Sequence, residues 1–359
     1  MSIIITILAT VFVLGILIFV HELGHFLVAK LFGVRVEAFS LGFPPQLVHK
    51  KIGDTDYRLS VVPLGGYVKM LGENPGEEIP PELQPFSFMH QPLWHRFLIV
   101  LAGPISNLIL AFLVFLLVFA VNGIPYLTTV ITEVEQNSPA AAAGLQPGDQ
   151  VLELNGRPVK RWEDLPPIIR QAGEHPLDLT LKRGQKIITV KVTPHREEVP
   201  NIFGGKSSAV IIGILNNKNL AIDNVGLGRA FVRAGDATWG VCYLTTLSLY
   251  KVLTGEAPLK GLGGPILIAQ VAGQEAKAGA APLLQFLATL SVNLFLLNLL
   301  PIPILDGGHL LFCALEAVRR KPVEIQHREI AQGVGLMLIL ALMILVFYQD
   351  IARLVNPPH

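Results

Sequence analysis

Two histidines and a glutamate lie inside a segment that is otherwise apolar enough to be buried in lipid. The pentapeptide His21-Glu22-Leu23-Gly24-His25 follows an apolar or small-residue run from Ile3 to Val20. Ionisable side chains at membrane depth cost about 2.5–3.5 kcal/mol each on insertion scales. Three of them in one turn therefore imply a compensating ligand, such as a metal ion.

The spacing of these three side chains agrees with a metal site. Residues four apart share one helix face, so His21 and His25 can both point at a metal while Glu22 lies beside them as a base. A chance match on a surface helix is the alternative, and the apolar surroundings weaken it. We therefore expect His21 and His25 to bind zinc and Glu22 to accept a proton.

The composition is typical of a membrane protein. Hydrophobic residues make up 51% of the chain and charged residues 15%, whereas a soluble domain carries about 25% charged residues. The net charge of +1 and the lack of a basic face argue against a nucleic-acid partner. The two cysteines, Cys242 and Cys313, lie far apart with no CxxC spacing, so neither a disulfide framework nor a Cys-ligated zinc site is expected.

Four segments are apolar enough to cross a bilayer. A hydrocarbon core about 30 Å thick needs about 20 helical residues, and the candidates are residues 3–32, 97–121, 282–300 and 330–347. The first begins without a basic residue, so we expect a retained helix rather than a cleaved signal peptide. Charged residues interrupt the segment 230–253, which favours an amphipathic helix at the membrane surface over a fifth span.

Basic residues predict the orientation of these spans. Seven lie between spans one and two, and four lie between spans three and four: Lys30, Arg35, Lys50, Lys51, Arg58, Lys69 and Arg96, then Arg319, Arg320, Lys321 and Arg328. Both loops should be cytoplasmic. The termini and the long segment between spans two and three then lie outside, and the metal lies nearer the cytoplasmic face.

The long outer segment changes from membrane helix to a small soluble fold. Strand-like runs alternate with turn signals such as Asn155-Gly156, and a hairpin closes around Arg183-Gly184. This organisation predicts a first part of the membrane core at 1–121, with β-hairpins at 34–72, and an α+β domain at 126–195. A linker with a surface helix follows at 196–281, and the second part of the membrane core is 282–359.

A catalytic zinc takes three protein ligands and keeps a fourth position for water, so one more ligand is needed. The best candidate is Asp306 in the run Asn298-Leu-Leu-Pro-Ile-Pro-Ile-Leu-Asp306-Gly-Gly-His309. Prolines interrupt this apolar span, and irregular backbone at membrane depth is tolerated where it lines a cavity. An Asp-Gly turn at the membrane boundary is the alternative reading, and His309 is a rival ligand.

These motifs together resemble the site-2 protease family of intramembrane zinc metalloproteases, over nearly the whole chain. The resemblance rests on the HELGH motif, the run from Leu101 to Asn107, the run from Gly263 to Ile266 and the NxxPxPxLDGG run. The stretch from Ser138 to Gly156 closely resembles bacterial PDZ domains, and the resemblance extends to about 70 residues around it. Some family members carry two PDZ domains, whereas this chain has one.

The resemblance implies the roles of the site residues and the fold. His21, His25 and Asp306 would bind Zn²⁺, Glu22 would be the base, and Asn298 would contact substrate. The fold would be a polytopic α-helical membrane protein with about four transmembrane helices, a re-entrant β-hairpin region and one inserted α+β PDZ domain.

The function implied is an intramembrane zinc endopeptidase in a bacterial cytoplasmic membrane. It would cut single-span membrane proteins within or near the bilayer, such as anti-sigma factors already shortened outside or remnant signal peptides, in regulated intramembrane proteolysis. The PDZ domain would bind a peptide at a sheet edge or exclude substrates with an intact outer domain. The alternatives are a non-catalytic PDZ scaffold with a structural metal and, more remotely, a metal transporter.

Overall fold

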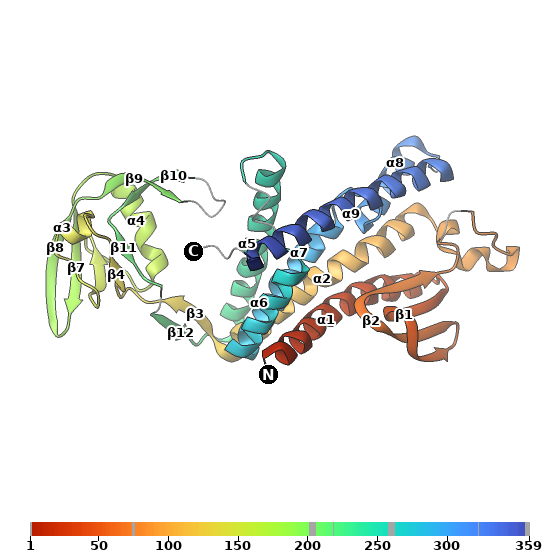
Figure 1. The fold of residues 1–359 in the computed structure, drawn as a ribbon, viewed down its shortest axis with the longest axis horizontal. Helices are drawn as coiled ribbons and strands as arrows, with labels where there is room; N and C mark the ends of the chain where they lie inside the picture. Colours follow the sequence, from red (N-terminus) through yellow and green to blue (C-terminus); the bar gives the residue numbers. More distant parts are fainter. Residues whose placement is uncertain are drawn as a thin grey trace. The chain divides into compact units, whose positions relative to one another are not determined.

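A computed structural model describes residues 2–73, 76–200, 206–217, 219–257, 263–321 and 323–355. It divides into two compact units, each described by itself below. The first unit contains the long helices and the predicted β-hairpin region, and the second is the inserted α+β domain (Figure 1).

Four helices in the described part of the chain are long and apolar enough to cross a membrane, as the sequence predicts. They are α1 (Ser2–Leu31), α2 (Leu93–Asn122), α7 (Ala280–Asn298) and α9 (Ile325–Val355). The fourth begins five residues before its predicted start, because hydropathy marks only the apolar part of a helix whose backbone continues beyond it.

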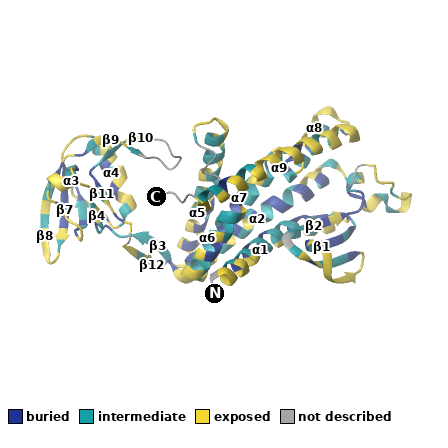
Figure 2. Ribbon diagram, in the orientation of Figure 1, coloured by how far each residue is buried: buried dark blue, intermediate teal, exposed yellow. Residues whose placement is uncertain are grey.

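The long helices expose many large apolar side chains on their outer faces. Ile3 on α1 is 72% exposed, and Ile344 on α9 is 71% exposed. Figure 2 shows such exposed positions along most of α9. Soluble proteins rarely expose large contiguous apolar patches, so these faces are suited to contact lipid.

The described part of the first unit also contains the helices α5 (Leu227–Leu253), α6 (Pro265–Ala278) and α8 (Asp306–Arg319). Helix α5 is not among the candidate spans, and its prediction as a surface helix stays untested. Helix α6 was not predicted, and its residue Gly273 packs against Thr6 of α1. The N-terminal end of α6 is held by Asp350 of α9, which accepts backbone hydrogen bonds from Gly264, Ile266 and Leu267 at 3.0–3.2 Å.

The region between α1 and α2 forms one bent hairpin, β1 (Val36–Ile52) and β2 (Thr55–Met70), beside α1 (Figure 1). Residues 38–41 of β1 each pair with two stretches of β2, namely 56–59 and 66–69. The hairpin therefore folds into a small sheet that leaves the end of β2 along one edge. Short 3₁₀ helices at Pro81–Phe86 and Phe88–His90 lead into α2.

The second unit has its own apolar core. Its four-stranded sheet has the order β6-β5-β7-β8, and the helices α3 and α4 supply further core residues. Fully buried side chains such as Val151, Leu179 and Ile131 fill this core. The elements are α3 (Pro139–Ala142), β5 (Gln150–Leu154), β6 (Arg157–Pro158), a 3₁₀ turn (Trp162–Asp164), α4 (Leu165–Ala172), β7 (Leu177–Arg183) and β8 (Lys186–Val192).

The prediction that a linker begins at residue 196 was wrong. The segment forms β9 (His195–Pro200), β10 (Lys206–Ile211), β11 (Ile214–Leu215) and β12 (Leu220–Asp223). Strands β11 and β12 pair with β4 (Glu133–Val134) and β3 (Ile124–Leu127) at the start of the unit. Strands β9 and β10 pair with each other. Strands β11 and β12 are only two and four residues long and take their hydrogen bonds from distant partners, so no local periodicity marks them.

Candidate metal centre

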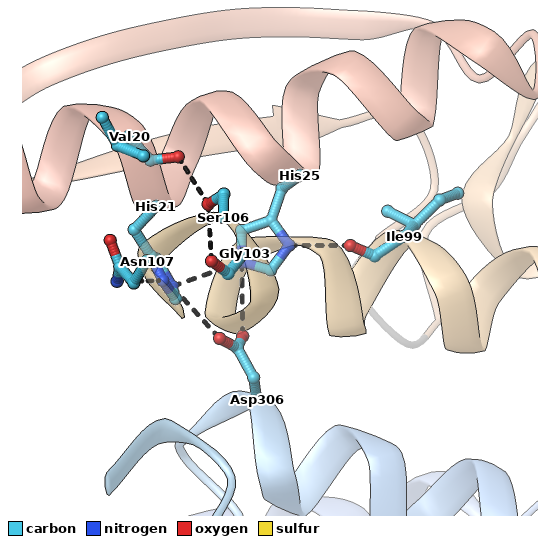
Figure 3. Close-up of polar contacts among 8 residues, drawn as sticks. All are labelled: Val20, His21, His25, Ile99, Gly103, Ser106, Asn107 and Asp306. Carbon is cyan, nitrogen blue, oxygen red and sulfur yellow. Dashed lines mark hydrogen bonds and ion pairs between the residues drawn. The ribbon is translucent and has the colours of Figure 1, made fainter. Parts of the chain in front are cut away.

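The two motif histidines and Asp306 come together between α1 and the first residue of α8 (Figure 3). Asp306 Oδ2 lies 3.1 Å from His21 Nε2, and Asp306 Oδ1 lies 3.5 Å from His25 Nε2. The two Nε2 atoms are 3.3 Å apart. Among the described residues this is the group of His, Cys, Asp and Glu side chains whose ligand atoms all lie within 4.8 Å of one another.

Local sequence explains how Asp306 reaches the site. The helix α7 ends at Asn298, the prolines that follow prevent its continuation, and α8 starts at Asp306 after an extended Leu305. Two glycines then allow close packing. A Cβ on Gly307 would collide with the carbonyls of Leu299 and Leu300, and one on Gly308 would collide with the backbone of the preceding loop.

The ring of His25 is oriented by helix α2. Its Nδ1 lies 2.8 Å from the backbone oxygen of Ile99, so Nδ1–H donates and the lone pair of Nε2 faces Asp306. A Cβ on Gly103 would collide with this ring. His25 is therefore presented in the tautomer that a metal requires.

The ring of His21 is oriented by Asn107, a residue to which the sequence analysis gave no role. The Asn107 amide lies 3.2 Å from His21 Nδ1, and Ser291 of α7 donates to the Asn107 backbone oxygen at 2.7 Å. Asn107 is fully buried, which is an unusual place for an amide in an apolar helix. An amide inside the apolar segment 97–121 is a signal that the sequence offers, but only the structure pairs this amide with His21.

The orientation of the Asn107 amide decides whether His21 Nε2 is free to bind a metal. With its nitrogen toward His21 Nδ1, the ring proton must sit on Nε2, and Asn107 Oδ1 is buried with no hydrogen-bond partner in the described part of the chain. Turning the amide by half a turn lets Oδ1 accept from Nδ1–H and frees the Nε2 lone pair. Asp306 Oδ2, also buried without a hydrogen bond, is a further ligand atom.

The donor set fits zinc. Two imidazole nitrogens and one carboxylate are ligands that catalytic zinc sites use, and they leave a fourth position open. The three side chains are only 10–19% exposed. An uncompensated carboxylate buried beside two imidazoles would be costly, and a divalent cation would compensate it.

A cavity of about 350 Å³ is lined by these three side chains and by Glu22, the remaining ionisable residue of the HELGH motif. The end of β2 forms one wall, where a Cβ on Gly66 would lie 3.3 Å from the Glu22 side chain. Glu73 also lines the cavity, and burial raises the pKa of its carboxyl, while the backbone N–H of Met70 donates to it at 3.1 Å. The cavity thus has room for water or a short peptide segment beside the half-buried Glu22 carboxylate.

The other predicted site residues lie differently. His309 lines the cavity but does not belong to the three-residue group. Asn298 is half-buried at the last position of α7 and is not among the residues that line the cavity. Its predicted contact with substrate stays a prediction.

Comparisons with known proteins agree with this site. The sequence matches the profile of peptidase family M50 over residues 9–342. A protein of Mesorhizobium japonicum, named as a zinc metalloprotease, is 38% identical over 362 residues, which cover 96% of this chain and 98% of that protein. A protein of Agrobacterium fabrum with the same description is 36% identical over 363 residues, with 96% and 95% covered.

The regulator of sigma-E protease RseP of Salmonella typhimurium is 32% identical, with 99% of this chain and 100% of that protein covered. Its alignment runs over 451 positions, more than the 359 residues of this chain, so that protein has inserted residues that this chain lacks. Among solved structures, the PDZ domain of an SdrC-like protein of Listeria monocytogenes is 21% identical, with 25% of this chain and 86% of that chain covered and a TM-score of 0.20.

The predictions of a metalloprotease and of a zinc cofactor are confirmed by these relatives. The family profile covers both halves of the candidate metal centre, because its range includes His21, His25 and Asp306. The chain belongs to peptidase family M50, the site-2 protease family of membrane-embedded zinc metalloproteases.

Proposed function

We propose that this protease hydrolyses peptide bonds of single-span membrane proteins within or near the bilayer. One observation carries the proposal: the His21, His25 and Asp306 group and its cavity lie between helices whose outer faces are apolar and exposed. A substrate that reaches this cavity must itself tolerate an apolar environment. A transmembrane helix does so, provided that it unwinds locally.

The proposed roles of the residues follow from their positions. When bound, zinc supplies Lewis acidity that activates water and polarises a carbonyl. His21, His25 and Asp306 would hold the ion, and the Glu22 carboxylate would take the proton from the attacking water and return it to the leaving nitrogen. Ile99 and Asn107 would keep the two rings in the correct tautomer.

The end of β2 would bind the unwound substrate. Residues 66–69 pair with β1 on one side, and Gly66, Tyr67 and Val68 line the cavity on the other. An extended peptide can add to such an edge through backbone hydrogen bonds. The hairpin would then dip into the membrane, and full aqueous labelling of single cysteines along its whole length would contradict that placement.

The inserted domain would select substrates through a groove that its own fold provides. A cavity of about 220 Å³ lies between α4 and the strands β10 and β11, lined by apolar residues that include Pro166, Ile169 and Ile214. We propose that it binds an extended peptide as PDZ domains do, or excludes substrates whose outer domain is intact. Anti-sigma factors shortened by another protease, and remnant signal peptides, would be natural substrates in regulated intramembrane proteolysis.

Neighbouring prolines offer a matched test of this groove. Pro166 lines it, whereas its exposed neighbour Pro167 does not. Pro166→Arg should weaken peptide crosslinking to the domain or allow cleavage of substrates with an intact outer domain. Pro167→Arg should behave as wild type, and equal behaviour of the two variants would contradict the proposal.

The orientation follows from the basic residues. We propose a multi-pass protein of the bacterial cytoplasmic membrane, with the termini and the inserted domain outside and the metal nearer the cytoplasmic face. Single cysteines placed at positions 320 or 321, just after α8, should react only from the cytoplasmic side of vesicles. Reaction from the outer side would reverse the assignment.

The decisive experiment compares wild type with Glu22→Gln on a tagged single-span substrate already truncated on its outer side. Positioned acid–base groups contribute about 10²–10⁴-fold, so we expect cleavage to fall by that factor while zinc content is unchanged. Equal product from both proteins would point to another catalytic group. No product from either would favour a scaffold with a structural metal.

A further inference from the structure

The catalytic cavity contains a basic residue that the proposed mechanism does not use. Arg328, near the start of α9, lines the cavity beside His309 and Gln332. Its side chain is 11% exposed. A charged side chain this deeply buried normally has a full set of partners.

The nearest carboxylate is already committed to another arginine. Glu316 of α8 accepts two hydrogen bonds from Arg96 of α2, at 2.6 and 3.0 Å, and the Nε of Arg96 donates to the backbone oxygen of Gln91 at 3.2 Å. This is the two-pronged geometry that makes arginine–carboxylate pairs strong. Arg328 approaches the same carboxylate only to 3.7 Å, outside hydrogen-bond distance.

The remaining contacts of Arg328 leave its donors poorly satisfied. One terminal nitrogen reaches the sulfur of Met89 at 3.8 Å, and the guanidinium lies 5.7 Å from the centre of the Phe312 ring. The Nε atom is buried with no hydrogen-bond partner in the described part of the chain. The three buried charges Arg96, Glu316 and Arg328 therefore carry one uncompensated positive charge at the cavity wall.

The acidic residues of the cavity do not reach ion-pair distance of this guanidinium. Among the described residues, Glu22, Glu73 and Asp306 form no ion pair with Arg328, and Asp306 pairs with the histidines instead. A buried, under-compensated guanidinium beside a cavity is suited to bind an anion of matching geometry. A peptide substrate supplies such an anion as a carboxylate.

We propose that Arg328 is a specificity-determining residue that binds a carboxylate of the substrate next to the cleaved bond. The proposal rests on the proposed proteolytic function. The carboxylate has two possible sources. One is an Asp or Glu side chain of the substrate, and the other is the new C-terminal carboxylate, which forms when water adds across the peptide bond and the other fragment leaves with a new amine.

Two experimental arms distinguish the sources. The first measures kcat/KM for single-span substrates with Asp or Asn at each position flanking the cleaved bond. The second measures competition binding of product peptides that end in a free carboxylate or an amide, using zinc-loaded Glu22→Gln, so it needs no cleavage. We expect wild-type Arg328 to favour the acidic member of a pair by about tenfold in at least one arm, as for a hydrogen bond between charged groups.

Variants connect this preference to Arg328. Arg328→Gln should abolish it, Arg328→Lys should keep part of it, and Arg319→Gln, on the exposed end of α8, should leave it intact. A preference for the acidic member in the first arm alone identifies a substrate Asp or Glu side chain as the group that Arg328 binds. A preference in the second arm alone identifies the new C-terminal carboxylate. If Arg328→Gln or the charge-retaining Arg328→Lys lowers kcat/KM and binding affinity equally for acidic and neutral partners in both arms, the proposal is contradicted. Arg328 would then be only a structural counter-charge. Absence of cleavage by wild type would refute the proteolytic function, while the binding arm would still decide the role of Arg328.

Discussion

At the scale of single residues, the proposed metal centre depends on partners that fix which nitrogen of each histidine would face the ion. The backbone of Ile99 does this for His25, and the Asn107 amide does it for His21. A backbone oxygen cannot be removed by substitution, but an amide can. Asn107 is therefore the residue at which this second layer of contacts can be tested.

Asn107→Ala should lower zinc affinity about 10–100-fold, the usual effect of removing a partner of a metal-bound histidine. Zinc retention against a graded chelator measures this directly. Ser106→Ala is the control. The Ser106 hydroxyl donates to the backbone oxygens of Val20 and Gly103, and among the described residues it has no hydrogen bond to either histidine ring. If both variants retain zinc equally, Asn107 does not orient His21.

At the scale of elements, the start of α8 and the inserted domain have the clearest sequence requirements. Helix α8 can place Asp306 only because two glycines follow it at positions where backbone lies too close for a Cβ. The inserted domain is held at one end by a buried carboxylate, Asp149, which pairs with Arg183. Each requirement leads to a prediction.

Gly308→Ala should destabilise the protein and loosen zinc, because its Cβ would collide with the backbone of Ile302 and Pro303. Overpacking of this kind costs about 1–3 kcal/mol. Gly333→Ala on α9 is the matched control, since a Cβ there meets no other atom within 4 Å. Thermal unfolding in detergent should separate the two variants, and equal melting temperatures would contradict the close packing.

Arg183→Gln should make the inserted domain less stable at neutral pH. The guanidinium donates to both oxygens of Asp149 at 2.7 and 2.8 Å and lowers the pKa of that carboxyl. A lowered pKa stabilises the folded state above the unfolded value of about 3.9, and this stabilisation is lost as the pH falls through the folded value. The difference in melting temperature between wild type and variant should therefore shrink below about pH 4, and a constant difference would exclude the ion pair as its cause.

At the scale of the whole molecule, the metal centre joins parts of the first unit that are distant in sequence. The three proposed ligands come from α1 and α8, and the groups that orient their rings come from α2. Arg96 and Glu316 connect α2 to α8 a second time. The membrane core should therefore respond to the metal as a unit.

Removal of zinc should lower the melting temperature of the whole membrane core. A ligand at 100 times its dissociation constant stabilises the state that binds it by about 2.7 kcal/mol. Glu22→Gln should keep this zinc-dependent shift, whereas His25→Ala should lose it. If His25→Ala retains the shift, the stabilising ion binds elsewhere.

The sequence alone determined the features that depend on local patterns. Four apolar runs long enough to cross a bilayer, the pairing of His21 with His25 on one helix face, and the turn signals of the inserted domain all lie within short stretches of chain. The hydrophobic effect and helix periodicity act at that range, so such patterns are readable without a fold. The predicted ligand role of Asp306 came from chemistry and family resemblance, and the structure places its carboxylate 3.1 and 3.5 Å from the two histidine rings.

Only the tertiary structure decided which distant side chains meet. Asn107 contacts a histidine 86 residues away, and Arg96 pairs with a glutamate 220 residues away. The strands β11 and β12 likewise form because the first strands of their unit supply their hydrogen bonds. These partners are chosen by packing between elements, which no local period encodes. The position of Arg328 at the catalytic cavity belongs to the same class, since its basic character was visible in the sequence but its place beside the cavity was not.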